Sequence, residues 1–75
     1  MRNLSVVIDR LLAVIPETEK QVRAGLEDVK SSYAYTAPEH HVELWRDAMY
    51  ILSAGLGEPD TDWKKEVSDI FSARK

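Results

Sequence analysis

The residues with the clearest potential for chemistry are two adjacent histidines. His40 and His41 stand between Glu39 and Glu43, and imidazole and carboxylate groups together can bind a transition metal. Adjacent side chains on a helix point about 100° apart, and no H-E-x-x-H or E-x-x-H spacing puts such ligands on one face. We therefore predict no metal site, with His41 partly buried and His40 solvated.

A second group of polar residues precedes the last predicted helix. Glu58, Asp60 and Asp62 place three carboxylates within five residues, which could suggest calcium. An EF-hand loop also needs a glycine at its sixth position and a glutamate at its twelfth, and here Trp63 follows Asp62 directly. We interpret these acids as the N-terminal cap and first turn of a helix, with Asp60 or Thr61 as the cap.

The sequence contains no motif that is typical of an enzyme. The chain has no cysteine and no G-x-S-x-G motif, and Gly55 and Gly57 lack the further glycines of a phosphate-binding loop. A bundle of this size also rarely forms a substrate pocket. We predict a protein that is not an enzyme and that uses no cofactor.

Length and charge restrict the classes of partner. The 75 residues suit a single domain (residues 1–75) with net charge −3, and residues 39–69 carry eight acids against three bases, a net charge of −5. Nucleic-acid binders usually show a basic stripe, so the charge argues against nucleic acid. The most apolar stretch, residues 6–15, is interrupted by Asp9 and Arg10 and is shorter than a membrane span. We expect no membrane contact and a cytoplasmic location.

Breaks at Pro16, residues 35–38 and residues 55–59 divide the chain into four segments with helical periodicity. The expected helices cover residues 4–15, 19–33, 38–54 and 61–73. Asn3 is the expected cap of the first helix. Thr18 with Gln21, and Thr36 with Glu39, match the capping-box pattern at the second and third. The predicted fold is all-α, a small three- or four-helix bundle.

Three backbone features bear on this fold. The apolar spacing stays in phase across Pro16, so one long kinked helix is an alternative, although proline disfavours helical geometry at Ile15. Gly25 marks either a close approach of two helices or a tolerated defect. Gly55 is the expected stop of the third helix.

Apolar surface is widest on the first and third segments. The apolar residues of the third cover about half of its circumference, so we expect it to be the central core helix. They are Val42, Leu44, Trp45, Ala48, Met49, Ile51 and Leu52. The first segment is apolar on nearly every side, including Val6 and Ala13, and a helix of this kind needs cover from more than one neighbour. A second copy of the chain is a candidate for part of that cover.

The exposed residue types expected on this fold favour a protein-binding function. Tyr35, Arg46 and Tyr50 are candidate contacts, because tyrosine and arginine are enriched at binding hot spots, and Val6 and Ala13 are apolar candidates on the first segment. The alternative for both tyrosines is that they cover neighbouring helices.

We therefore predict a non-catalytic interaction module: an adaptor, inhibitor or regulatory accessory protein that binds another protein or forms a homodimer. Phages, mobile elements and secretion systems commonly use such small proteins. The alternative is a helix-turn-helix DNA-binding regulator that reads DNA with the helix at 61–73. Lys64 and Lys65 lie near the start of that helix, among acidic residues that repel phosphate.

Overall fold

A computed structural model describes residues 3–72 of the chain. Its elements are α1 (Leu4–Val14), α2 (Lys20–Tyr33), a 3-10 turn η1 (Pro38–His40), α3 (His41–Leu56) and α4 (Asp62–Ser72). No strand occurs among the described residues, and the predicted all-α bundle is confirmed. The four predicted helices are all present, although the third starts as a 3-10 turn and ends later than expected, and residue 73 lies outside the described residues.

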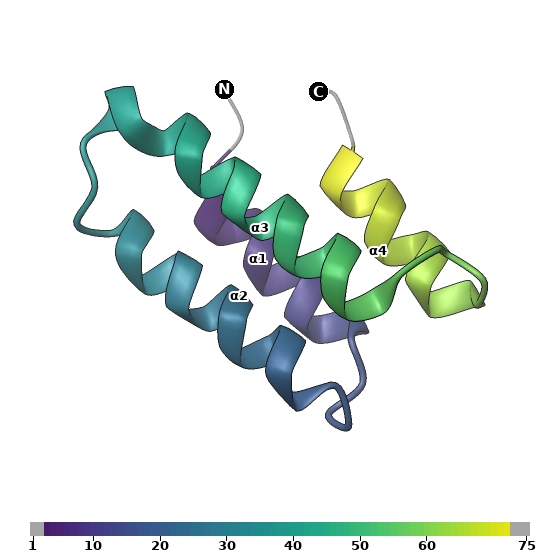
Figure 1. Ribbon diagram of the computed structural model, residues 1–75. Coiled ribbons are helices and arrows are strands. Elements are labelled where there is room, and N and C mark those ends of the chain that lie inside the picture. Colours follow the sequence, from purple (N-terminus) through teal and green to yellow (C-terminus); the bar gives the residue numbers. More distant parts are fainter. Residues whose placement is uncertain (1–2, 73–75) are drawn as a thin grey trace.

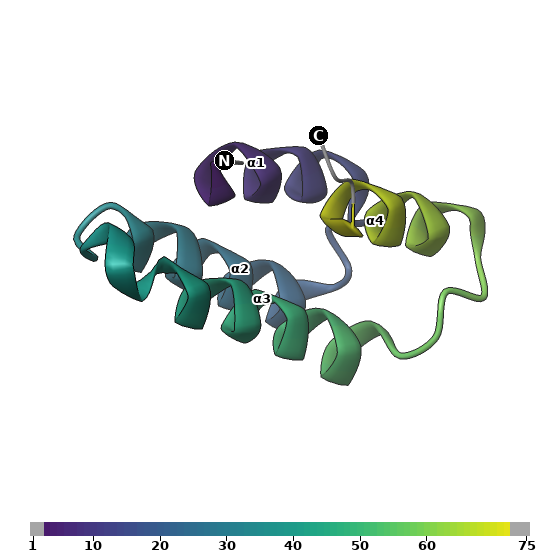
Figure 2. The ribbon, with the colours of Figure 1, turned by 90° about the horizontal axis from the view of Figure 1, so that it is seen from above.

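The four helices form two layers (Figures 1 and 2). Figure 2 shows α1 and α4 in one layer and α2 and α3 in the other. Helix α2 packs against both α1 and α3, while α4 packs chiefly against α1. The order of packed neighbours is therefore α3, α2, α1, α4, and the two outer helices of this series are not closely packed on each other.

The centre of the bundle is α1 and not α3. Leu4, Ile8 and Leu11 of α1 are completely buried, and Leu26 of α2 is buried with them. The prediction that the third helix is the central one is wrong, because α1 has close neighbours in both layers while α3 packs chiefly on α2. One side of α3 is consequently left to solvent.

The sequence predicts caps at four helix starts, and those of the second and third helices differ in the structure. Helix α4 begins at Asp62, directly after Thr61, whose carbonyl accepts from the Lys65 N–H at 3.0 Å. Asn3 Oδ1 accepts from the Ser5 N–H at 2.9 Å and the Val6 N–H at 3.4 Å, which confirms that cap. Helix α2 begins after Glu19 without a side-chain cap, so the box of Thr18 with Gln21 is wrong.

The box predicted at Thr36 and Glu39 does not form either. The Thr36 hydroxyl donates to the Ser32 carbonyl at 2.6 Å, and Ala37 is the cap of η1. Thr36 lies close behind the end of α2, and its hydroxyl is a further donor to the Ser32 carbonyl, which also accepts from the Tyr35 N–H at 3.0 Å.

Pro16 separates α1 from α2, and the alternative of one kinked helix is excluded. Ile15 adopts extended geometry, with ψ 127°, as expected for a residue before proline. The Arg23 guanidinium Nη1 then reaches back from α2 and donates to the carbonyls of Leu12 at 2.8 Å and Ile15 at 2.7 Å. Arg23 thus satisfies the open carbonyl end of α1.

Two glycines allow α2 and α3 to approach closely. A Cβ atom at Gly25 would lie 3.1 Å from Ile51 Cδ1, and a Cβ atom at Gly55 would overlap with Val22 Cγ2. Gly25 therefore marks a close approach. The prediction that Gly55 ends the helix is wrong: α3 runs to Leu56, and Gly57, with φ 70°, is the C-cap.

Candidate protein-interaction surface

The two histidines serve different local contacts. His40 Nδ1 lies 3.4 Å from Glu43 Oε2 on the surface, whereas His41 Nε2 lies 2.9 Å from the Thr36 carbonyl oxygen. Because a carbonyl only accepts, Nε2 of His41 is the donor, and the His41 ring stacks on Tyr33 with centroids 4.2 Å apart. His41 is therefore a structural residue of the α2–α3 connection. No group of three or more potential metal-ligating side chains occurs in the described part of the chain.

Helix α4 presents few free cations to a phosphate backbone. Lys64 Nζ lies 3.2 Å from Asp60 Oδ1 and 5.8 Å from the centroid of Trp63, and its side chain is only 20% exposed. Lys65 is exposed, but it shares the exposed side of α4 with Asp62, Glu66 and Asp69. This arrangement does not favour DNA reading by α4.

Exposed apolar side chains gather on α3. Among the large apolar residues described, Val42, Met49 and Tyr50 are 56%, 53% and 74% exposed. Val42 and Met49 are seven residues apart, which places them on one face of the helix two turns apart. The prediction that they belong to the core is wrong, because α2 is the one described α-helix that packs closely on α3 and it leaves this face uncovered.

Between α3 and α4 lies a groove of about 250 Å³, which we call the α3–α4 groove. Its lining is apolar for the most part and includes Met49, Leu52, Leu56, Pro59, Val67 and Phe71. Lys64 is the one charged residue in the described lining, and it is paired with Asp60. The rings of Trp45 and Phe71 meet across the two helices with centroids 5.4 Å apart.

The other edge of α3 borders a groove of different chemistry, which we call the α2–α3 groove. Its floor includes Gly25 and Ile51, and Asp28, Asp47 and Tyr50 line its rims. No described residue pairs with either aspartate. The two grooves that α3 borders thus differ in charge: the α3–α4 groove is close to neutral and the α2–α3 groove is acidic.

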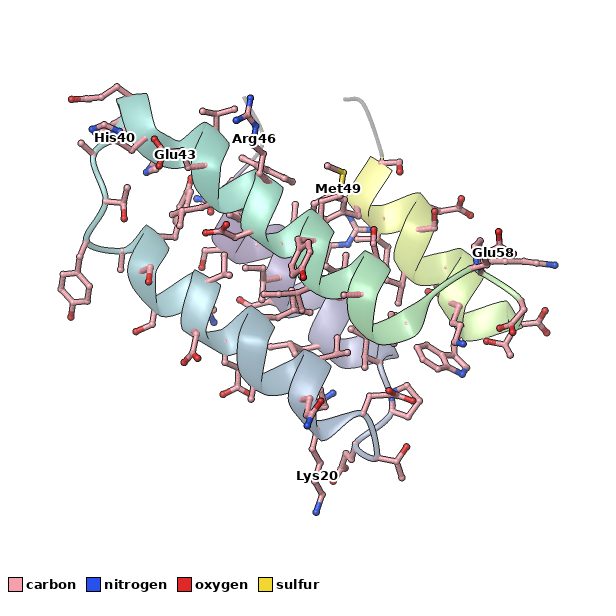
Figure 3. All side chains as sticks on the ribbon, in the orientation of Figure 1. Lys20, His40, Glu43, Arg46, Met49 and Glu58 are labelled. Carbon is pink, nitrogen blue, oxygen red and sulfur yellow. The ribbon has the colours of Figure 1, made fainter. Side chains whose placement is uncertain are left out.

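The predicted contact residues fall into three groups. Arg46 and Tyr50 are one turn apart on the exposed side of α3, and Figure 3 shows Arg46 extending away from the bundle while Met49 lies on the α4 side. Val6, 55% exposed, and Ala13 share the outer face of α1. Tyr35, 90% exposed, stands apart in the turn after α2.

The sequence pattern did not identify Val42 and Met49 as surface residues. The available signal was the width of the apolar stripe on this helix, which exceeds what one packed neighbour can cover. Because only α2 packs closely on α3 among the described α-helices, part of that stripe stays exposed.

Comparisons with known proteins do not identify a relative: no family model, no curated protein and no solved structure matches the chain. Among the described residues, no helix has the length and apolar character needed to cross a membrane.

Proposed function

We propose that this domain is a non-catalytic protein–protein interaction module that binds with the exposed side of α3 and the adjoining α3–α4 groove. The observation that carries the proposal is the exposure of Val42, Met49 and Tyr50, all more than half exposed, on one helix. Exposed large apolar side chains that gather on one helix support an interaction site there. Tyrosine, methionine and arginine are also the residue types enriched in interfaces.

The distribution of polar residues supports a binding role over catalysis. No polar or charged residue is buried in the described part of the chain. Catalytic groups usually sit in clefts that perturb their ionisation by burial and by charged neighbours. The chain would therefore act by occupying a partner's surface, as an adaptor, inhibitor or regulatory subunit does. We also propose a cytoplasmic location, where a domain without cysteine is at no disadvantage.

The test compares proteins captured from an extract of the native host. The baits are the wild-type chain, the α3 variant Val42→Gln/Met49→Gln/Tyr50→Gln, and the control Val6→Gln/Tyr35→Gln, which removes exposed apolar groups from other elements. We expect the wild type and the control to retain the same protein partner and the α3 variant to lose it. Equal retention by the α3 variant, or recovery of nucleic acid alone, would overturn the proposal.

A further inference from the structure

We infer that the α2–α3 groove binds an arginine side chain of a partner protein, with the guanidinium between the carboxylates of Asp28 and Asp47 and against the ring of Tyr50. This groove borders the opposite edge of α3 from the α3–α4 groove. It shares only Tyr50 with the surface of the proposed function. The inference therefore goes beyond that function and does not depend on it.

The packing of α2 on α3 places the two aspartates opposite each other. The helices run side by side and antiparallel (Figure 1), and Gly25 of α2 lies against Ile51 of α3. Asp28 stands one turn further along α2, and Asp47 stands one turn back along α3. Both side chains line the same groove of about 340 Å³. Two carboxylates from different helices thus border one opening at the same level.

No basic residue of the described chain neutralises these two carboxylates. The described lining of the groove holds no lysine, arginine or histidine. Neither aspartate has a basic residue three or four positions away on its own helix, where such pairs form. Two bases of α2 are engaged with α1: Lys30 pairs with Asp9, and Arg23 bonds to the last carbonyls of that helix. Like charges repel, so a cation from a partner would relieve the repulsion across the groove.

The rest of the lining favours arginine over a metal ion. Calcium needs six or more oxygen ligands, and no group of three potential metal ligands occurs among the described residues. The groove offers instead an apolar floor with Leu44 and Ile51, and the ring of Tyr50, 74% exposed, one turn after Asp47. A guanidinium bonds to carboxylates and stacks on an aromatic face, while its apolar stem lies along apolar surface.

The exposure of the groove indicates that the arginine belongs to a longer basic segment. Asp28 and Asp47 are both exposed, and one exposed ion pair contributes little binding free energy. Neighbouring residues of the segment add contacts to Tyr50 and to the floor of the groove. The net charge of −5 on residues 39–69 attracts such a segment over a longer distance.

Selection of peptides on the immobilised full chain tests the class of ligand. The probe is a random dodecapeptide library, and the wild type should enrich peptides in which arginine stands beside an apolar residue. The variant Asp28→Asn/Asp47→Asn should not enrich them. Absence of arginine enrichment on the wild type, or equal enrichment on the variant, would overturn the inference.

Fluorescence anisotropy with a selected peptide tests the two carboxylates. Asp28→Asn/Asp47→Asn should weaken binding about tenfold, as expected for the loss of two ion pairs. Glu66→Gln/Asp69→Asn is the matched control, since it removes the same charge from exposed sites on α4 and should bind like the wild type. Equal weakening by both double variants would show that net charge attracts the peptide, and this result would overturn the site.

Two further substitutions test the guanidinium and the ring. Citrulline in place of the peptide's arginine keeps the shape but removes the charge, and it should weaken binding to the wild type as much as the aspartate variant does. Tyr50→Phe should bind like the wild type, whereas Tyr50→Ser should bind several-fold more weakly. Full affinity of the citrulline peptide would overturn the role of the guanidinium. Equal affinities of the two Tyr50 variants would remove the ring from the site.

Folding is checked by urea unfolding. The two aspartates bond to no described residue, so Asp28→Asn/Asp47→Asn should not lower the urea midpoint, and its loss of binding then reports on the site itself. The proposed function has a separate readout, which is capture of a host protein. Val42→Gln/Met49→Gln leaves the α2–α3 groove unchanged and should bind the arginine peptide like the wild type. A chain that captures a host protein but selects no arginine peptide refutes only the present inference.

Discussion

The indole ring of Trp45 on α3 and the phenyl ring of Phe71 on α4 lie with centroids 5.4 Å apart and planes inclined by 56°. Both rings are partly buried against the core. The contact joins the two outer helices of the series across the α3–α4 groove, where the backbones themselves are not closely packed. It therefore holds α4 in a position that leaves the rest of the groove open.

Replacing either ring should loosen α4 and destabilise the fold. Because the rings are only partly buried, we expect Phe71→Ala to lower the free energy of unfolding by about 2 kcal/mol, less than for a core phenylalanine. A double-mutant cycle with Trp45→Ala, measured by urea unfolding, should give a coupling energy of about 1 kcal/mol. Strict additivity of the two substitutions would show that the rings do not stabilise each other.

The start of α1 offers a direct test of the observed caps. Asn3→Ala removes the acceptor for the Ser5 and Val6 N–H groups and should lower the free energy of unfolding by about 1 kcal/mol. Thr18→Ala is the comparison, because the sequence pattern makes it a cap and the structure leaves α2 without a side-chain cap. Urea unfolding should show almost no change for Thr18→Ala. A loss equal to that of Asn3→Ala would restore the predicted capping box.

Arg23 should contribute more to the free energy of unfolding than is usual for a partly exposed side chain. Arg23→Met keeps much of the apolar stem but removes the donor to the Leu12 and Ile15 carbonyls, and we expect a loss of about 2 kcal/mol in the free energy of unfolding. Lys20→Met is the control, since it removes the same charge from an exposed site on the same helix. Equal effects of the two substitutions would show that the loss of stability comes from the change in net charge and not from the lost hydrogen bonds.

The helix positions could be predicted from periodicity, but the place of each helix in the bundle could not. The apolar half of α3 was interpreted as the sign of a central helix, yet Val42 and Met49 are exposed. Stripe width shows how much surface a helix can bury, and the neighbours decide how much it does bury. The cap predicted at Thr36 was wrong for a related reason. Its hydroxyl can bond to the helix before it or to the helix after it, and the turn geometry selects the Ser32 carbonyl.

For Gly55→Ala, the nearby Val22 side chain predicts a loss of stability, whereas helix propensity alone predicts a gain. In an open helix Gly→Ala stabilises by about 1 kcal/mol, but a Cβ atom at Gly55 would overlap with Val22 Cγ2. Overpacking at a close helix–helix contact should make Gly55→Ala destabilising by about 1–2 kcal/mol in net terms. Urea unfolding of the single variant determines the sign.

Two comparisons separate overpacking from any other cause of that loss. At Gly25 the new Cβ atom would meet Ile51 Cδ1 at 3.1 Å and Cγ2 at 3.3 Å. A shift of a few tenths of an ångström relieves these contacts and offsets the gain in helix propensity, so Gly25→Ala should be nearly neutral. Val22→Ala creates space beside Gly55, and the double variant Val22→Ala/Gly55→Ala should be clearly more stable than the sum of the two single effects predicts. Additive losses would mean that α2 and α3 have room at Gly55 and that their close approach has another cause.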